Sequence, residues 1–149
     1  MKSKFLYRAA SVLFVLFAAG HTFGFLNFRP PTAEAVAVRD AMDRVHFVGN
    51  HSYGGFYIGL GLYATVYLLF SAFLAWQLGT LSARAPQAAR PLGWTLFAVQ
   101  LASLALAYLY FGAPPMVFSA LTAICLFAAA GPWNRDRGER PDEAAGLRA

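Results

Sequence analysis

Four long apolar stretches, separated by short polar segments, dominate the hydrophobic pattern of this chain. They cover residues 5–28, 52–78, 92–111 and 115–133. An uncharged apolar run of roughly 20 residues is what an α-helix needs to cross the hydrocarbon core of a membrane. The pattern therefore predicts an all-α integral membrane protein, a four-helix bundle within residues 1–133, with no second domain.

Proline and glycine mark the ends of these predicted helices. Arg29-Pro-Pro31 stops the first helix, because proline lacks a backbone donor and biases its predecessor away from helix. We expect residues 81–90 to form a polar connector, and Gly112-Ala-Pro-Pro115 to form a tight turn before the fourth helix. Charged residues mixed with glycine and proline predict a disordered tail over residues 134–149.

The polar segment between the first two stretches has the pattern of a short amphipathic helix. Thr32 can cap its start, and Glu34 stands in the first turn, where the helix dipole favours an anion. One face carries Val38, Met42 and Val45. We expect the helix to end at His46, before the break at Gly49-Asn50. It lies either at the membrane surface or, solvated, over the end of the bundle.

The first apolar stretch also has features of a secretory signal. Basic residues precede it, and Ala18-Ala-Gly20 offers small residues for cleavage, which would leave His21 at the new N-terminus. However, the apolar character continues to Phe28, which a signal does not need. A retained helix is the favoured interpretation.

The positions of basic and aromatic residues predict the orientation in the membrane. The basic residues that flank the apolar stretches are Lys2, Lys4, Arg8, Arg84 and Arg90. Lysine and arginine concentrate on the cytoplasmic side, and aromatic residues concentrate at both interfaces. Trp76, Trp94 and Trp133 would lie at the same interface as the basic residues. We therefore expect a multi-pass membrane protein whose termini are both cytoplasmic.

Composition narrows the function classes. The chain is 58% hydrophobic and 13% charged, whereas a soluble domain carries about 25% charged residues. Its 12 Lys and Arg residues outnumber its 7 Asp and Glu residues, but they form no basic face, so nucleic acid is not expected as a partner. Cys125, which lies in an apolar run, is the single cysteine. Because a second cysteine is lacking, an intrachain disulfide and a thiolate metal cluster are excluded.

Catalytic chemistry has little support. The four stretches contain no Asp or Glu, and basic residues stand only near the start of the first, so proton-coupled transport and paired-carboxylate catalysis are disfavoured. We expect no strands and therefore no dinucleotide-binding or phosphate-binding loop. Gln100, in mid-span, must face the bundle, where an interhelical hydrogen bond is favoured over contact with a ligand. Gly55 and Gly59 form a small-residue pair for helix packing, with packing inside the bundle favoured over a lateral contact between two copies.

The candidate site is a set of polar and aromatic residues at the outer end of the bundle. Its predicted ligand-binding members are His21, Asn50, His51, Tyr53 and Tyr57. His21 is 16 residues beyond Phe5, about 24 Å along a helix, and so lies near the outer edge of the membrane core. His46 can converge on His21 and His51, which leaves three uses open: interfacial hydrogen bonding, ligand contact, or a zinc, copper or haem site.

Three segments resemble a known kind of membrane protein. They are Ala19-Gly-His-Thr-Phe-Gly24, residues 52–62 (Ser-Tyr-Gly-Gly-Phe-Tyr-Ile-Gly-Leu-Gly-Leu) and Leu74-Ala-Trp-Gln-Leu-Gly79. They resemble an uncharacterised family of small bacterial four-helix membrane proteins, itself distantly DoxX-like, and the likeness covers about residues 5–131. In that family an aromatic and an acidic residue often follow the tyrosine, where this chain has Gly54 and Gly55. The resemblance implies the architecture and a location in the bacterial inner membrane, and it transfers no catalytic residue.

Three functional hypotheses follow from these observations. The first is a binding protein that holds a lipid, a quinone or another apolar ligand at the outer end of the bundle. The second is a non-catalytic subunit that associates with a second copy or another membrane protein. The third, less favoured, is a metal- or haem-dependent membrane enzyme. The sequence itself requires no cofactor, and membrane lipids are the partners that it implies.

Overall fold

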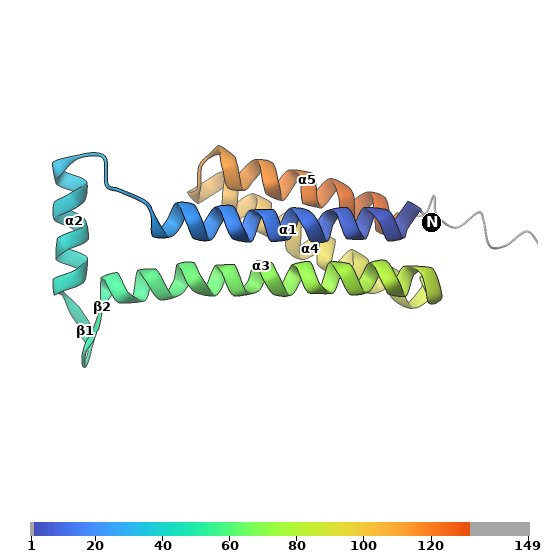
Figure 1. Ribbon diagram of the computed structural model, residues 1–149, viewed down its shortest axis with the longest axis horizontal. Coiled ribbons are helices and arrows are strands. Elements are labelled where there is room, and N and C mark those ends of the chain that lie inside the picture. Colours follow the sequence, from blue (N-terminus) through green and yellow to red (C-terminus); the bar gives the residue numbers. More distant parts are fainter. Residues whose placement is uncertain (1, 132–149) are drawn as a thin grey trace, which may run out of the picture.

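The computed structural model of the protein describes residues 2–131. Five helices and a short hairpin make up this part of the chain, as Figure 1 shows. In order they are α1 (Lys2–Leu26), α2 (Ala33–Arg44), β1 (His46–Val48), β2 (His51–Ser52), α3 (Tyr53–Arg84), α4 (Pro86–Tyr110) and α5 (Ala113–Ala130). The tail predicted over residues 134–149 lies outside the described residues.

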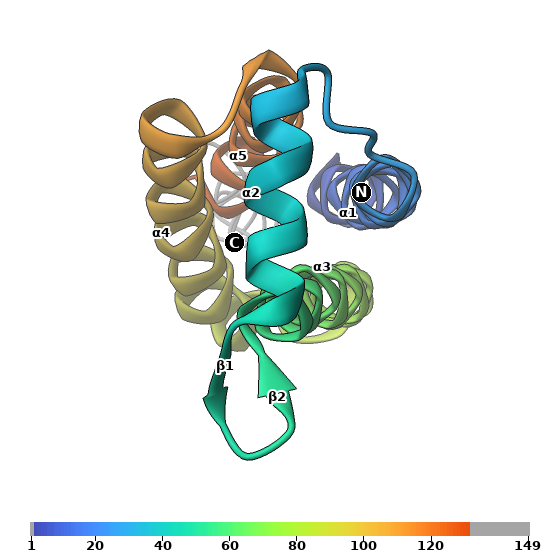
Figure 2. The ribbon, with the colours of Figure 1, turned by 90° about the vertical axis from the view of Figure 1, so that its left-hand side faces the viewer.

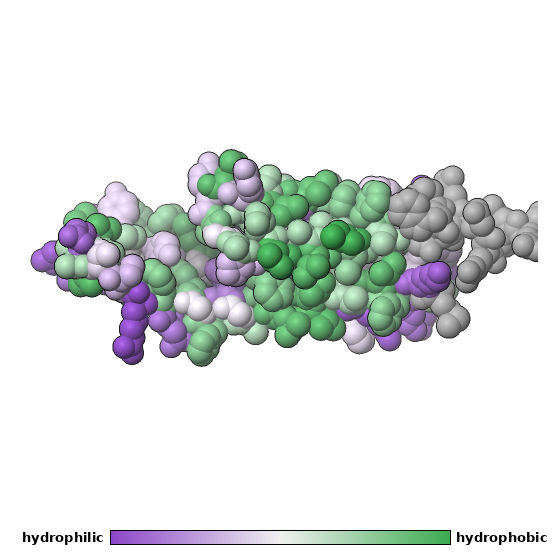
Figure 3. Space-filling model, turned by 90° about the horizontal axis from the view of Figure 1, so that it is seen from above, coloured by the Kyte–Doolittle hydropathy of each residue, from purple (hydrophilic) through white to green (hydrophobic). Residues whose placement is uncertain are grey.

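The four long helices confirm the predicted fold class. α1, α3, α4 and α5 are each at least 18 residues long and apolar enough to cross a membrane. Seen end-on in Figure 2, they surround a common axis, with α1 between α3 and α5, and α4 completing the ring. A broad apolar band covers the middle of the molecule in Figure 3, with hydrophilic residues toward both ends. The chain is therefore an all-helical, multi-pass membrane protein.

The core of the bundle lies at the end where α1 begins and α3 connects to α4, which we call the basic end. Tyr7, Phe14 and Leu126 are buried there among alanines of α1, α3 and α5. Small residues let the backbones approach closely, since a β-carbon on Gly79 would lie 3.2 Å from the Lys4 carbonyl oxygen. Gly93 of α4 similarly makes room for the Tyr7 side chain.

At the other end, which we call the α2 end, α3 and α4 have separated. The two helices meet at Ala85, and α4 then crosses toward the start of α5, as Figures 1 and 2 show. Apart from Gly54, the buried residues of α3 all lie between Ala72 and Gly79. The first half of α3 consequently packs on α1 and leaves most of its apolar side chains exposed.

The predicted connector over residues 81–90 is almost entirely helical, so that prediction was wrong. α3 continues to Arg84, and α4 starts at Pro86, so that Ala85 alone separates them. Proline suits the first turn of a helix because its missing N–H group has no intrahelical partner there in any case. Polar residues mark where the membrane ends, but they do not end a helix.

The expectation that the chain has no strands was also wrong for one short segment. β1 and β2 pair antiparallel, with His46 opposite Ser52 and Val48 opposite His51. Gly49 adopts a φ of 51°, which favours glycine, and so allows the tight turn. α2 therefore ends at Arg44 rather than at His46, and Ser52 caps α3 by accepting a 3.0 Å hydrogen bond from the Gly55 N–H group.

The predicted amphipathic helix is present as α2. Thr32 caps it by accepting a 3.2 Å hydrogen bond from the Ala35 N–H group, as predicted. Hydrogen bonds from the backbone and from Thr32 lower the pKa of Glu34 in the first turn. Figures 1 and 2 show α2 lying across the end of the bundle, crosswise to α1 and α3. No residue of α2 is buried.

Candidate functional site

His21 lies in the contact between α1 and α3, where its ring is partly buried. Its Nε2 atom donates a hydrogen bond to the Gly61 carbonyl oxygen at 3.0 Å. The hydroxyl groups of Thr22 and Thr65 lie 2.8 Å apart in the next layer. Phe25 fills the space beside Gly61, where any β-carbon would collide with its ring. These contacts tie α3 to α1 along the half of α3 that α4 does not reach.

A chain of aromatic rings passes through His21 and links three helices. The His21 ring stacks on Phe25 at 5.7 Å between centroids, and Phe25 lies 5.3 Å from Tyr57 of α3. On the other side, Phe17 meets His21 edge-on at 6.5 Å and stacks on Phe118 of α5 at 5.4 Å. Such ring pairs stabilise a core beyond their buried area. His21 therefore acts as a packing residue with a satisfied hydrogen bond.

The other predicted polar members lie on the hairpin, away from His21. Asn50 and His51 are exposed, and His46 donates from Nδ1 to the carbonyl oxygen of Arg44 at 3.0 Å. Tyr53 belongs to a second aromatic group, in which Phe47 lies 5.4 Å from Tyr53 and 5.5 Å from Phe56. Gly61 comes eight residues after Tyr53, which is about 12 Å along the helix. The predicted site is thus divided into two separate groups.

The three histidines do not converge in the structure. Within residues 2–131, no group of three His, Cys, Asp or Glu side chains is placed to hold a metal ion. His21 is occupied by the Gly61 carbonyl group, while His46 and His51 are exposed on the hairpin. The geometry accordingly offers no support for the zinc, copper or haem site that the sequence left open.

The glycines of α3 have different surroundings from those expected. A β-carbon on Gly59 would meet no atom within 4 Å, and one on Gly55 would meet only the Ser52 hydroxyl oxygen, at 3.4 Å. The expected internal packing against this pair is therefore absent. The close contacts belong to Gly61, which faces Phe25, and to Gly54, which faces the carboxylate of Asp43. Gly55 and Gly59 leave an open, small-residue face on α3.

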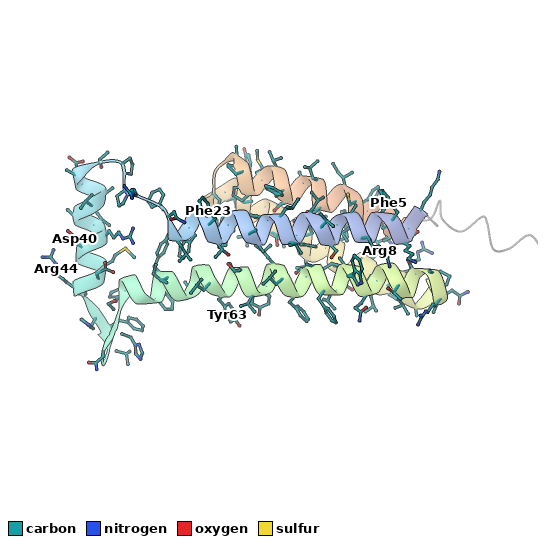
Figure 4. The ribbon with its side chains drawn as sticks, in the orientation of Figure 1. Phe5, Arg8, Phe23, Asp40, Arg44 and Tyr63 are labelled. Atoms are coloured by element: carbon teal, nitrogen blue, oxygen red, sulfur yellow. The ribbon has the colours of Figure 1, made fainter. Side chains whose placement is uncertain are left out.

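Other polar side chains within the spans have hydrogen-bond partners on the same or a neighbouring helix. Gln100 is 4% exposed and donates from its side-chain amide to the Ser119 carbonyl oxygen at 3.2 Å, which confirms its interhelical role. The hydroxyl groups of Tyr63 and Tyr67 lie 3.4 Å apart, so each tyrosine has the other as a partner. Tyr63 points away from α1 in Figure 4 and is 59% exposed.

A groove between α4 and α5 at the α2 end has the size of a ligand site. Its volume is about 580 Å³. Its lining is apolar apart from one tyrosine and consists of Leu101, Leu104, Ala105, Tyr108, Met116, Val117 and Ala120. Sequence reasoning missed these residues because they look like ordinary lipid-facing positions. The groove arises from how α4 crosses α5, which no local motif encodes.

Comparisons with known proteins do not identify this chain. No protein family, no curated protein and no solved structure matches it. The likeness of residues 5–131 to small four-helix bacterial membrane proteins therefore stays a prediction.

Proposed function

We propose that this protein is a non-catalytic membrane protein that binds a long-chain apolar molecule, a lipid or a quinone, in the α4–α5 groove. The groove itself is the observation that carries the proposal. Ligand sites in proteins are typically concave, mostly apolar and about 300–1,000 Å³ in volume, and the α4–α5 groove holds about 580 Å³. It lies toward the α2 end, where the sequence predicted a ligand site, but on different helices.

The lining of the groove selects for a hydrocarbon chain. Leucine, valine and alanine side chains supply most of its surface, and Met116 adds a flexible side chain that adapts to irregular shapes. No charged residue lines it, so an ionised group would be desolvated there without a partner. Tyr108 offers one hydroxyl group, which can donate to an ester or quinone oxygen at the polar end of the ligand.

The surroundings suit a membrane ligand whose polar end is near the surface. We place the basic end in the cytoplasm of a bacterial cell, with both termini there, because lysine and arginine favour that side of the inner membrane. The α2 end then faces outward, so that Asn50 and His51 of the hairpin and Tyr53 at the start of α3 lie at headgroup level. A thiol reagent that does not cross the membrane should label Asn50→Cys in intact cells and leave Gln87→Cys unlabelled, in a Cys125→Ala background.

Photocrosslinking with a diazirine-bearing phospholipid or quinone tests the binding site. Wild-type protein should crosslink within residues 101–120, as mapped by peptide mass spectrometry. Ala105→Phe fills the groove and should reduce that crosslink, whereas Ala102→Phe is the matched control, since Ala102 is exposed on the same helix outside the groove. Equal crosslinking in both variants, or labelling spread evenly over all four spans, would contradict the proposal.

A second candidate function, association with another membrane protein or a second copy, is favoured by the open face at Gly55 and Gly59. Helices in membranes associate through small residues that let backbones approach. Gly59→Leu adds bulk where the chain itself has no neighbour within 4 Å, so it should leave the bundle intact and abolish any partner contact there. A protein that is monomeric in native-like membranes both before and after this change would exclude the second candidate.

A further inference from the structure

In the part of the chain that the structure describes, the basic end carries cations and no acidic side chain. Its five basic residues are Lys2, Lys4, Arg8, Arg84 and Arg90. Among residues 2–131 the acidic side chains are those of Glu34, Asp40 and Asp43, and all three belong to α2 at the opposite end. Within the described chain, the positive charge of the basic end is therefore balanced by no carboxylate.

Arg8 differs from the other four because the α1–α3 contact holds it in place. Its Cγ atom lies 3.3 Å from where a β-carbon of Gly79 would stand, so the side chain fills the gap that this glycine leaves. Its guanidinium carbon lies 4.5 Å from the centre of the Trp76 ring, a cation–π contact. Figure 4 shows Arg8 between α1 and α3. The guanidinium group is thus fixed in position before any ligand binds.

At least one N–H group of the Arg8 guanidinium has no hydrogen-bond acceptor within residues 2–131. Its Nε atom is buried and has no hydrogen-bond partner within residues 2–131. A buried donor without a partner costs free energy, and a charged one costs more. Lys4 stands one helical turn before Arg8 on the same face of α1, where like charges repel. An anion at the accessible part of the guanidinium group would relieve the repulsion between Lys4 and Arg8 and would compensate the charge of a partly buried group.

An apolar surface continues from this position toward the middle of the membrane. Val12 and Val15 follow Arg8 on the same face of α1 and are 52% and 46% exposed. On α3, Phe73 stands one turn from Trp76 and is 58% exposed. A phospholipid would place its phosphate at Arg8 and an acyl chain along this surface, whereas a free phosphate ion would use only the polar part.

We propose that Arg8, with Lys4 and Trp76, binds the phosphate group of an anionic phospholipid in the leaflet at the basic end. The guanidinium group donates charge-assisted hydrogen bonds to the phosphate oxygens, and Trp76 holds it in the required orientation. An acyl chain of the lipid packs on Val12, Val15 and Phe73. Basic pockets between membrane helices recognise lipid headgroups in this way. The site is at the opposite end of the bundle from the α4–α5 groove and does not depend on it.

Native mass spectrometry of the full chain, released from nanodiscs of mixed phosphatidylglycerol and phosphatidylcholine, tests the proposal. Wild-type protein should retain phosphatidylglycerol in preference to phosphatidylcholine. Arg8→Gln should lower the apparent affinity for phosphatidylglycerol by about tenfold or more. Arg84→Gln is the matched control: it removes the same charge from an exposed position at the same end and should have a smaller effect, about fivefold or less.

A second variant covers the case in which Arg8→Gln does not fold. Trp76→Leu alters a side chain that is 45% exposed and removes the cation–π contact, so it should weaken phosphatidylglycerol retention in an intact bundle. Wild-type retention of phosphatidylglycerol in Arg8→Gln, or equal losses in Arg8→Gln and Arg84→Gln, would overturn the proposal.

Two further measurements distinguish a bound phospholipid from the two other anions that could pair with Arg8, free phosphate and the carboxylates of the tail. Inorganic phosphate at millimolar concentration should not displace the bound phosphatidylglycerol, and full displacement would indicate a site for the free ion. The tail carries the carboxylates Asp136, Glu139, Asp142 and Glu143. Changing all four to the corresponding amides should leave the lipid preference unchanged. If the preference appeared only after that change, the tail would be the partner of Arg8 and the proposal would be wrong.

Discussion

Replacing Gly93 by alanine should destabilise the bundle by forcing apart three helices at the basic end. Gly93 lies in α4 at the point where α1 and α5 both approach. A β-carbon on Gly93 would collide with the Tyr7 hydroxyl group and lie 3.3 Å from the β-carbon of Ala130. Tyr7 is 1% exposed, so its ring has little room to move.

The expected magnitude follows from two opposing effects. Inserting a methyl group into a packed core costs about 1–3 kcal/mol. Alanine in place of glycine within a helix gains about 1 kcal/mol. Gly59→Ala is the reference variant, because it gains the same helix propensity on an open face of α3, where the new methyl group meets no other atom. The free energies of unfolding of the two variants should therefore differ by about 1–3 kcal/mol, with Gly93→Ala the less stable.

A double-mutant cycle with Tyr7→Phe makes this prediction specific. Removing the hydroxyl group clears the atom that the new methyl group would meet, so Tyr7→Phe should offset part of the cost of Gly93→Ala. Contacting residues show coupling energies of about 0.5–3 kcal/mol. Unfolding in mixed micelles with increasing denaturing detergent, followed by circular dichroism, measures all four variants. Equal stability of Gly93→Ala and Gly59→Ala, or no coupling to Tyr7→Phe, would refute the packing that we describe.

Other contacts lead to three smaller effects. Gln100→Leu breaks the hydrogen bond to Ser119 and should cost about 0.6 kcal/mol in the same assay; a loss above about 2 kcal/mol would mean that Gln100 does more than join α4 to α5. Because the folded-state pKa of Glu34 is lowered, its contribution to α2 is complete above the unfolded value near 4.5 and is lost as the pH falls through the lower folded value. The amide protection factors in α2, which are corrected for the intrinsic exchange rate at each pH, should then fall on acidification, and Glu34→Gln should abolish that pH dependence. Gly54→Ala should displace Asp43 and loosen α2 from α3, so unchanged amide exchange in α2 would contradict their contact.

The number and type of helices could be predicted because they depend on local properties. A span needs length and apolar residues, and both are visible in the sequence. The surface helix was found from its cap, since Thr32 and Glu34 act within one turn of the helix that they start. Residue-level boundaries were less accurate: α3 continues to Arg84 because a helix does not stop where the membrane stops.

The hairpin was missed although a signal for it existed. Gly49-Asn50 stands between Phe47-Val48 and His51-Ser52, and a Gly-X pair between such residues is typical of a two-residue β-turn. We interpreted the pair as a helix break because helices surround it. The outcome matters for the site, since the hairpin carries His51 away from the bundle axis rather than toward His21.

The site itself could not be predicted, because the sequence does not say which helices are neighbours. Gly59 and Gly61 are two residues apart and point about 200° apart around α3. Only the fold decides that Gly61 meets α1 while Gly59 faces outward. The length of helix between Phe5 and His21 correctly predicts which half of the bundle contains His21. It does not predict the direction of the side chain around the helix, and His21 and His51 are not neighbours. The α4–α5 groove depends wholly on the crossing of two helices.

Identification of what co-purifies with the full chain tests the proposed function most directly. The protein would be extracted from its native membrane in mild detergent and analysed by native mass spectrometry, with wild type and Ala105→Phe compared in parallel. The α4–α5 groove predicts one long-chain apolar molecule bound at about one per chain in wild type, and lost from Ala105→Phe. Wild-type protein with no retained apolar molecule, or with the same molecule retained equally by both, would contradict it.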